Sequence, residues 1–308
     1  MIRRQIAVEM GMIIPVVRIR DNIQLEPNEY RLKIKGSEIA RGTLLLDHYL
    51  AMSPGEDDPT IRGVDTIEPA FGLPAKWIGE DMKEQAEMSG YTVVDPPSVV
   101  STHITELLKR HCHELLGRKE TKQLIDHLKQ SDETLVSEVT PEPLSIGDVQ
   151  KVLSNLLIEN VSIKNLPVIF EVLADVGTMS KDTDLLTEYV RQGLARQISE
   201  QYVRDNLLKV FTLDPALEGT ISESIQRTEH GNYLALDPEI TQSMIQQVVQ
   251  LIENQSDIDQ EPIILCSPAV RLHIKQLLSR AIPQIVVLSY NELVPTIEIQ
   301  SIGVVNAS

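Results

Sequence analysis

The sequence is poor in aromatic residues, in cysteines and in cations. Its 308 residues include one Trp, three Phe and seven Tyr, so leucine, isoleucine and valine must fill the interior. The two cysteines, Cys112 and Cys266, exclude a disulfide framework and a Cys-x-x-Cys metal site. Because 28 Lys and Arg stand against 45 Asp and Glu, the net charge of −17 argues against broad binding to nucleic acid or to an anionic membrane.

Long apolar runs are also missing. No run approaches the roughly 18 residues that a membrane-spanning helix needs, and the basic start at residues 3–4 has no signal-peptide core behind it. A hydrophobic content of 42% is still sufficient for packed cores. We therefore expect a chain that is soluble as given and that resides in a reducing compartment. The helix expected at 2–10 reads as the end of a segment that begins upstream.

The sequence motifs of catalysis and cofactor binding do not occur. Neither glycine-rich phosphate loop is present, and there is no Gly-x-Ser-x-Gly elbow. His103, His111, His113 and His127 lack the spacing that would let two histidines on one helix share a metal ion. We predict no catalytic residue, no metal site and no cofactor, and a protein that is not an enzyme.

Hydrophobic periodicity predicts mixed structure at the start of the chain. Alternation of Tyr30, Leu32 and Ile34 with charged residues indicates a strand, with 38–43 as its hairpin partner. The apolar run 13–19 predicts a buried strand. Further along, we expect a loop at 53–75, a helix at 76–89, a strand at 91–94 and a helix from 98 to 116.

The middle of the chain is expected to be helical and its end to alternate strands with helices. Two of the middle helices, at 145–157 and 165–174, have the outline of a helix-turn-helix, but residues 118–200 hold 9 Lys or Arg against 14 Asp or Glu. A recognition helix needs a basic face, so no nucleic acid is expected. The predicted fold class is α+β, with several small subdomains: a mixed α/β part, a winged-helix-like helical middle and a C-terminal α/β layer.

A Pro- and Gly-rich stretch carries apolar side chains where loops are usually polar. Pro54, Phe71 and Leu73 are examples, with Trp77 directly after them. One interpretation is a small core formed by the loop folding back on itself. The other is an exposed apolar hollow that receives a helix of another protein.

Ten segments together resemble the cytoplasmic domain of the FlhA/InvA family, the export-gate proteins of type III secretion. The fragment Glu-Pro-Ala-Phe-Gly-Leu, which starts at residue 68, and the ending favour the flagellar branch. The match spans nearly the whole chain. Its segments are 15–22, 30–36, 38–42, 68–78, 90–94, 99–103, 116–122, 152–157, 186–191 and 286–292.

The resemblance implies a domain that follows an N-terminal membrane region and lies at the cytoplasmic face of the bacterial inner membrane. It implies self-association into a ring that docks flagellar chaperones with their cargo and orders export. It also implies contact with other export-apparatus proteins, including the ATPase complex. Four subdomains are expected, at 1–46 with 96–116, 47–95, 117–196 and 197–308.

The resemblance also locates a chaperone site between the first two subdomains. Its acidic residue, phenylalanine and threonine correspond to Glu68, Phe71 and Thr102, and Glu68 departs from the aspartate expected there. Val94 and Val99 are expected to line the hollow, with Pro54 as a weaker candidate. Glu68 and Thr102 would satisfy polar groups of the partner at the rim.

Three alternatives remain open from the sequence. The chain can be an injectisome homologue of the same family, or a purely structural ring component that binds no chaperone. A member of a different class, an α/β hydrolase or a nucleotide-binding enzyme, is the third. The identity of the chaperones and the number of subunits in the ring do not follow from the sequence.

Overall fold

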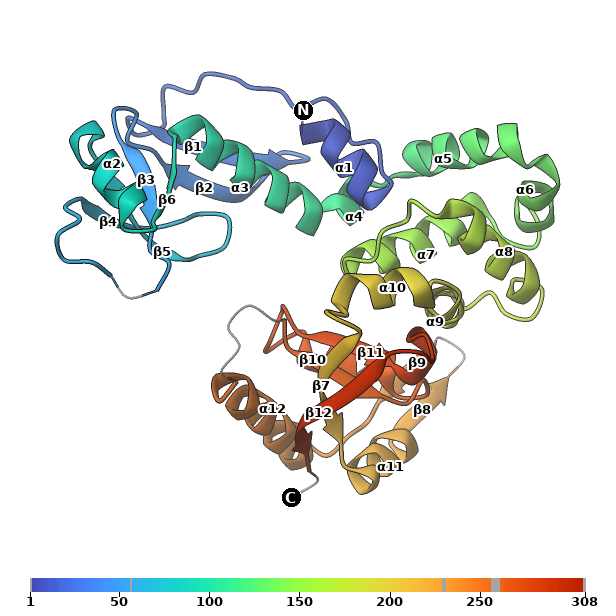
Figure 1. Cartoon of the computed structure of the whole chain (residues 1–308). Coiled ribbons are helices and arrows are strands. Elements are labelled where there is room, and N and C mark those ends of the chain that lie inside the picture. Colours follow the sequence, from blue (N-terminus) through green and yellow to red (C-terminus); the bar gives the residue numbers. More distant parts are fainter. Residues whose placement is uncertain (1, 56, 229–230, 256–260, 307–308) are drawn as a thin grey trace. The chain divides into compact units, whose positions relative to one another are not determined.

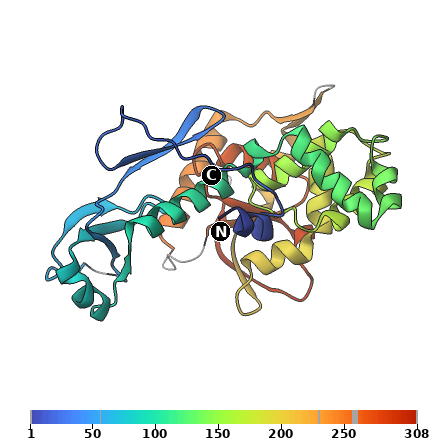
Figure 2. The same ribbon diagram turned by 90° about the horizontal axis from the view of Figure 1, so that it is seen from above.

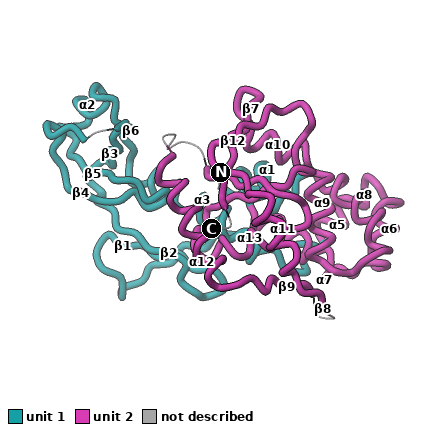
Figure 3. Tube along the Cα trace, turned by 90° about the horizontal axis from the view of Figure 1, so that it is seen from below, with its two compact units in different colours: residues 1–122, 160–164 teal, residues 123–159, 165–308 magenta. Residues whose placement is uncertain are grey.

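The computed structural model describes residues 2–55, 57–228, 231–255 and 261–306 (Figure 1). The chain forms two compact units (Figure 3): unit 1 is residues 1–122 with 160–164, and unit 2 is residues 123–159 with 165–308. Helices and several small sheets are mixed in both units, which confirms the α+β class. The four-subdomain division is finer than these two units and stays a prediction.

Unit 1 begins with the predicted helix at 2–10, which ends directly before Gly11. Helix α1 (Ile2–Met10) is followed by Gly11 in the left-handed region, with φ +76. A Cβ atom at this position would lie 2.2 Å from the backbone nitrogen of Lys164, so only glycine fits. Ile163 donates its backbone N–H to the Met10 carbonyl at 2.9 Å, which attaches the segment 160–164 to unit 1.

The predicted hairpin is present, but the strand expected at 13–19 is not. Strands β1 (Glu29–Ile34) and β2 (Ser37–Thr43) pair antiparallel. Residues 13–19 form no strand, and Val16 and Ile19 are 68% and 93% exposed. The prediction of a buried strand was therefore wrong, because an apolar run reports only local preference, while a strand also needs a neighbouring strand for its backbone hydrogen bonds.

A four-stranded antiparallel sheet forms the second part of unit 1. Its order is β4–β5–β3–β6, and helix α2 (Glu80–Met88) connects β5 to β6. The predicted strand at 91–94 is confirmed as β6, whereas the predicted loop 53–75 contains β4. The helix predicted from residue 76 starts at Glu80, because Trp77 pairs and packs as part of β5. The strands are β3 (Tyr49–Met52), β4 (Val64–Ile67), β5 (Pro74–Ile78) and β6 (Thr92–Val94).

Helix α3 (Pro96–Arg110) connects this sheet to α1, as Figures 1 and 2 both show. The side chain of Asp95 accepts the Ser98 N–H and caps the helix, and two prolines occupy the first turn, where no N–H is needed. The predicted helix 98–116 is thus two helices, since α3 ends at Arg110 and α4 (Cys112–Leu115) follows.

Unit 2 contains the helical middle. A capping box of Ser145 and Asp148 starts α7, which confirms the helix predicted at 145–157. The apolar positions of α7 and α8 are buried at helical spacing, for example Leu153, Leu156 and Phe170. The helices are α5 (Arg118–Ser131), which begins in unit 1, α6 (Glu133–Val139), α7 (Ile146–Ile158), α8 (Leu166–Val176), α9 (Thr183–Gly193) and α10 (Ala195–Tyr202).

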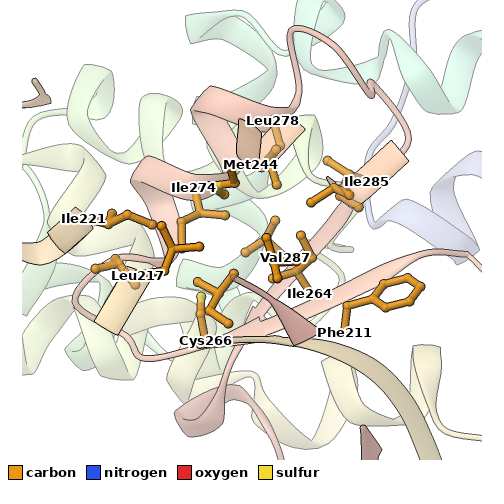
Figure 4. Packing of buried hydrophobic residues seen from close by; sticks show 14 of the residues in the cluster. Phe211, Leu217, Ile221, Met244, Ile264, Cys266, Ile274, Leu278, Ile285 and Val287 are labelled. Carbon is orange, nitrogen blue, oxygen red and sulfur yellow. The ribbon is translucent and has the colours of Figure 1, made fainter. Parts of the chain in front are cut away.

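The C-terminal part of unit 2 is a layered α/β structure, as predicted. Its parallel sheet has the order β11–β10–β7–β12, and Figure 4 shows the apolar core that it shares with three helices. A hairpin of β8 (Ile225–Thr228) and β9 (Gly231–Leu234) was not predicted. The other elements are β7 (Leu207–Leu213), α11 (Pro215–Glu223), α12 (Pro238–Glu253), β10 (Ile263–Cys266), α13 (Arg271–Leu278), β11 (Val286–Ser289), the short 3-10 helix η1 (Tyr290–Glu292) and β12 (Glu298–Val305).

Five charged side chains connect the helical middle to the α/β layer, three of them buried (Arg191, Arg271 and Glu292) and two partly buried (Glu159 and Glu188), and we name them the ionic cluster. Arg271 is 0% exposed, and it donates to Glu159 at 2.7 and 2.9 Å and to Glu188 at 2.5 and 2.7 Å. Arg191 donates to both carboxylate oxygens of Glu292, at 2.5 and 3.2 Å. Because buried charges are tolerated only when they are paired, these contacts fix α7, α9, α13 and η1 together.

The ionic cluster predicts a loss of stability in acid. Burial alone would raise the pKa of Glu159, but Arg191 and Arg271 outweigh it and hold that pKa at about 2. A carboxyl with a depressed pKa stabilises the fold above its unfolded pKa of about 4.3, and this contribution disappears as the pH falls toward 2. Burial raises the pKa of Glu188, which acts in the opposite direction and reduces the net loss.

The measurement is urea unfolding of the whole chain, natural and Glu159→Gln, at several pH values between 5 and 2, with the unfolding of unit 2 as the readout. We expect the natural chain to lose roughly 3 kcal/mol more than the variant over this range, since the variant has no carboxyl to protonate. Parallel curves for the two proteins would contradict the assignment.

Candidate docking site

The predicted site centres on the tight turn between β4 and β5, residues 68–73, which we name the Phe71 turn. The Glu68 N–H donates to the Leu73 carbonyl at 2.8 Å, and the Gly72 N–H donates to the Glu68 carbonyl at 2.9 Å. Gly72 has φ +72, a backbone conformation that residues with a Cβ atom rarely adopt. The backbone of the turn is therefore fixed by its own hydrogen bonds.

The Glu68 side chain holds the Phe71 turn from the inside. It is 3% exposed, and its two carboxylate oxygens accept the backbone N–H groups of Ala70 at 2.9 Å and Phe71 at 2.7 Å. The expected role of Glu68 at the rim, in contact with a partner, does not agree with this position. Its carboxylate is buried and already occupied by the backbone, so it positions Phe71.

Helix α3 supplies a second clamp that the sequence did not indicate. Arg110, at the end of α3, donates to the Ala70 carbonyl at 2.8 Å. The Ala70 peptide groups are thus held by Glu68 on one side and by Arg110 on the other. Arg110 follows Glu68 by 42 positions in the sequence, and no local pattern relates the two.

A neutral polar pair lies beside Glu68. The hydroxyl of Tyr30 is 2.7 Å from Nδ1 of His103, which is 4% exposed. Burial lowers the pKa of His103, partly opposed by the negative charge of Glu68. Burial and the same charge raise the pKa of Tyr30 to about 12. Both side chains are therefore uncharged near neutral pH, and they attach β1 to α3 next to the turn.

Phe71 itself points into solvent. Its side chain is 57% exposed, and the apolar side chains of Ile67 and Leu73 next to it are 67% and 49% exposed. Exposed aromatic and aliphatic side chains on a rigid turn are typical of a protein-binding surface. Of the two interpretations of this stretch, the small core applies to Trp77, which is 5% exposed, and the exposed apolar surface applies to Phe71.

Val94 and Val99 lie together beneath the surface. Val99 is 2% exposed and belongs to a core cluster with Leu50, Ala75 and Trp77. Val94 is half-buried, packs against this cluster and stands opposite Leu50 in the β3–β6 pair. The expectation that Val99 lines a hollow was therefore wrong for this structure, because its side chain is part of the core. Val94 retains partial exposure.

Thr102 and Pro54 are exposed and lie outside this cluster. Thr102 is on α3, one position before the buried His103. Pro54 follows the end of β3 and lies next to Gly90. Because β3 and β5 pair antiparallel, with Ala51 opposite Lys76, the end of β3 and the start of β5 lie together. Pro54 is therefore at the same end of the sheet as the Phe71 turn. The structure thus brings Glu68 to Phe71 and Val94 to Val99, with Thr102 and Pro54 as separate exposed positions of unit 1.

One prediction follows directly from the Glu68 geometry. In Glu68→Gln the amide group has one oxygen, so one of the two N–H groups of the turn loses its acceptor. Bonds to a charged acceptor contribute about 1.5–3 kcal/mol, and we expect amide exchange at Ala70 or Phe71 to accelerate at least tenfold in the free protein. Exchange is read residue by residue by NMR, with the amide of Ser98 at the α3 cap as the reference. Unchanged exchange would show that Glu68 does not hold the turn.

No group of three or more His, Cys, Asp or Glu side chains in the described part of the chain is arranged to hold a metal ion. Burial raises the pKa of the Cys112 thiol to about 11 and also raises that of Cys266. Among the described residues, no helix is long and apolar enough to span a membrane.

Unit 2 has a separate polar cleft of about 1040 Å³ between α7, α9, α13 and the β8–β9 hairpin. His273 lines it, is 7% exposed, and its Nδ1 has no hydrogen-bond partner among the described residues. The other lining side chains carry both signs of charge, including Asp148, Lys151 and Asp182. This mixture gives no preference for a ligand of one sign.

Comparison with known sequences identifies relatives along almost the whole chain. The FHIPEP family profile matches residues 1–298. The flagellar biosynthesis protein FlhA of Bacillus subtilis is 61% identical over 307 residues, which are 99% of this chain and 45% of that protein. FlhA of Borreliella burgdorferi is 40% identical, over 97% of this chain and 43% of that protein. The chain thus spans less than half the length of these relatives.

Solved structures share the fold of this chain over almost its whole length. The Chlamydia pneumoniae CdsV protein superposes with a TM-score of 0.89 at 29% identity, covering 99% of this chain and 88% of that one. CdsV in its complex with CdsO gives a TM-score of 0.86 at 29% identity, with the same coverage. The nonameric EPEC SctV-C gives 0.79 at 26% identity, covering 99% and 91%.

Proposed function

The chain belongs to the FHIPEP family, and from this premise we propose that it is the cytoplasmic docking platform of a flagellar type III protein export gate. In this role it binds chaperone–substrate complexes and orders their export. The proposal places it at the cytoplasmic face of the bacterial inner membrane, joined to a membrane region. The match to this chain covers 45% of the Bacillus subtilis relative, so that relative is long enough to contain such a region as well. The flagellar branch is favoured over the injectisome branch because identity is 61% to a flagellar relative and 29% to CdsV.

The exposure of Phe71 on a doubly clamped turn is the observation that carries the docking role. Glu68 and Arg110 fix the backbone beneath it, so the aromatic side chain is presented without a large loss of conformational entropy on binding. A partner helix or linker would cover Phe71 together with Ile67 and Leu73. Thr102, Pro54 and the exposed part of Val94 would lie at the margins of this contact.

Self-association into a ring is the second part of the proposal. SctV-C, which shares the fold, is described as nonameric. The charge of this chain is also unevenly divided: unit 2 has 11 Lys and Arg against 26 Asp and Glu, while unit 1 has 17 against 19. Contact between the less acidic unit of one copy and the acidic unit of the next would reduce repulsion between copies.

Contact with other export-apparatus proteins, including an ATPase complex, completes the proposed role. The complex of CdsV with CdsO supports the idea that domains of this fold bind further proteins. In this proposal the domain works by binding and needs no catalytic residue. A reproducible rise in melting temperature with a nucleotide or a divalent metal ion would instead favour an enzyme, with the unit 2 cleft as the place to look.

The direct test is titration of the chain with flagellar chaperones, both free and loaded with cargo, by isothermal calorimetry. We expect saturable binding of the loaded chaperones in the micromolar range, about −8 kcal/mol, because a few apolar contacts must offset the entropy of association. Binding of injectisome chaperones in preference would support the other branch. Self-association without binding of any chaperone would leave only a structural ring component and would overturn the docking role.

A further inference from the structure

Unit 1 contains a second concave surface, a groove of about 580 Å³ bounded by residues 14–25, by β1 and β2, and by α3 with α4. Its floor is apolar and includes Val16, Val17, Leu32, Ile104, Leu108 and Leu115. All of these residues are half-buried or exposed, so none is sealed into a core. Apolar side chains left accessible around a groove are the usual mark of a binding surface.

The rim of the groove is positively charged, in a chain whose net charge is −17. Arg18, Arg20 and Lys33 line it, are exposed, and make no ion pair with any residue that the structure describes. Arg31 is paired with Glu29 and Glu38 outside the groove. Among the described residues lining the groove, Asp21 is the one acidic side chain. The free cations favour a ligand that carries carboxylates.

The backbone around the groove has unused hydrogen-bonding capacity. The sheet of β1 and β2 has two strands, so the second edge of β1 has no neighbouring strand in the described part of the chain. Residues 13–19, most of which line the groove, form no strand and are not paired with β1 either. Pairing of residues 13–20 with β1 would bring Arg18 and Arg20 close to Lys33, and such like-charge contacts are unfavourable.

We propose that this groove binds an extended segment of a partner protein in which acidic side chains alternate with aliphatic ones. The segment adds as a strand to the free edge of β1, its carboxylates pair with Arg18, Arg20 and Lys33, and its aliphatic side chains cover the apolar floor. Alternation places the two kinds of side chain on opposite faces of a strand, which matches a cationic rim above an apolar floor. The interaction is separate from docking at the Phe71 turn.

The two surfaces use different residues of α3. Arg110 holds the Phe71 turn, whereas Ile104, Leu107 and Leu108 line the groove. Phe71 is not among the residues that line the groove. A substitution at Phe71 should therefore leave binding in the groove unchanged, which separates a failure of this inference from a failure of the docking function.

The probe is a fluorescein-labelled peptide of eight residues in which glutamate and valine alternate, with both ends capped, titrated by fluorescence anisotropy at low salt. The natural chain is expected to bind it saturably, and Arg18→Glu/Arg20→Glu to bind it at least tenfold more weakly. The same double variant should gain affinity for a peptide with lysine in place of glutamate. Amide exchange at residues 31–35 should slow when the acidic peptide binds, because the edge of β1 becomes paired.

A control variant tests whether the loss of affinity is specific to the groove. Arg4→Glu/Arg62→Glu makes the same change of charge at two exposed arginines outside the groove, and it should leave the affinity within twofold of the natural value. Equal binding of the acidic and the basic peptide, or full affinity in Arg18→Glu/Arg20→Glu, would overturn the proposal. A third result would also overturn it: sedimentation showing that the natural chain is a dimer, that Arg18→Glu/Arg20→Glu is a monomer, and that no peptide binds. The occupant of the groove would then be a second copy of the chain.

Discussion

Phe71→Ala is expected to weaken binding of a cargo-loaded flagellar chaperone roughly 10- to 100-fold. The natural side chain is 57% exposed in the free chain, so burying it against a partner removes a large apolar surface from water. Burial of a phenylalanine side chain contributes about 1.5–3 kcal/mol, and each 1.4 kcal/mol corresponds to a factor of ten in affinity. Truncation leaves the folded chain almost untouched, because an exposed side chain contributes little to the core. Calorimetric titration of both proteins with the same complex gives the comparison.

Tyr233→Ala is the matched control for this experiment. Tyr233 is an aromatic side chain of similar exposure, 54%, on β9 of unit 2. Its removal should change the affinity less than twofold, which excludes a general effect of losing surface aromatics. Equal affinities of the natural chain and Phe71→Ala, with both proteins folded by circular dichroism, would remove Phe71 from the proposed site.

Arg271→Ala should destabilise unit 2 by about 3–5 kcal/mol. The substitution removes the guanidinium that pairs with Glu159 and Glu188 and leaves both partly buried carboxylates without it. An unpaired buried charge costs far more than the pair contributed, so the loss exceeds that of an ordinary surface substitution. A double variant, Arg271→Met/Glu188→Leu, should recover part of this loss, because it removes one charge of each sign and fills the space with apolar atoms.

The two units can be followed separately in this experiment. Trp77 is the single tryptophan and lies in unit 1, so its fluorescence reports unit 1, whereas circular dichroism is dominated by the many helices of unit 2. We expect Arg271→Ala to lower the urea concentration at the midpoint of the circular dichroism transition, while the midpoint of the Trp77 fluorescence transition stays unchanged. Arg280→Ala, which removes an exposed arginine two residues after α13, should change the stability by less than about 0.5 kcal/mol. A similarly small effect of Arg271→Ala would contradict the stabilising role of the ionic cluster.

Strongly periodic segments of this chain could be predicted from the sequence. The β1–β2 hairpin, strand β6 and helix α7 follow from residue spacing within a few positions. Such features depend on neighbours in the sequence, and there local preference and the tertiary fold agree. The failures have the opposite cause. Residues 13–19 have a strand pattern without a partner strand, and Trp77 was assigned to a helix although it pairs within β5.

Some features of the candidate site were predicted from the sequence and others were not. The family resemblance located Glu68 and Phe71, and the exposure of Phe71 agrees with the interpretation of its surroundings as an apolar surface. The inward direction of the Glu68 carboxylate, the burial of Val99 and the clamp from Arg110 were not predictable. Each depends on which side chains distant in sequence meet in the folded chain.

By itself, the sequence determined the composition-level constraints, the class of the fold and the family. Acidic charge, scarce cysteine and the absence of catalytic motifs are properties of the list of residues, and helical or strand periodicity needs only neighbouring positions. The tertiary structure alone decided which carboxylates are buried and paired, as in the ionic cluster, and which apolar side chains stay in solvent, as at Phe71 and in the basic groove. The reason is that burial, pairing and exposure are relations between segments far apart in the chain, and only folding establishes them.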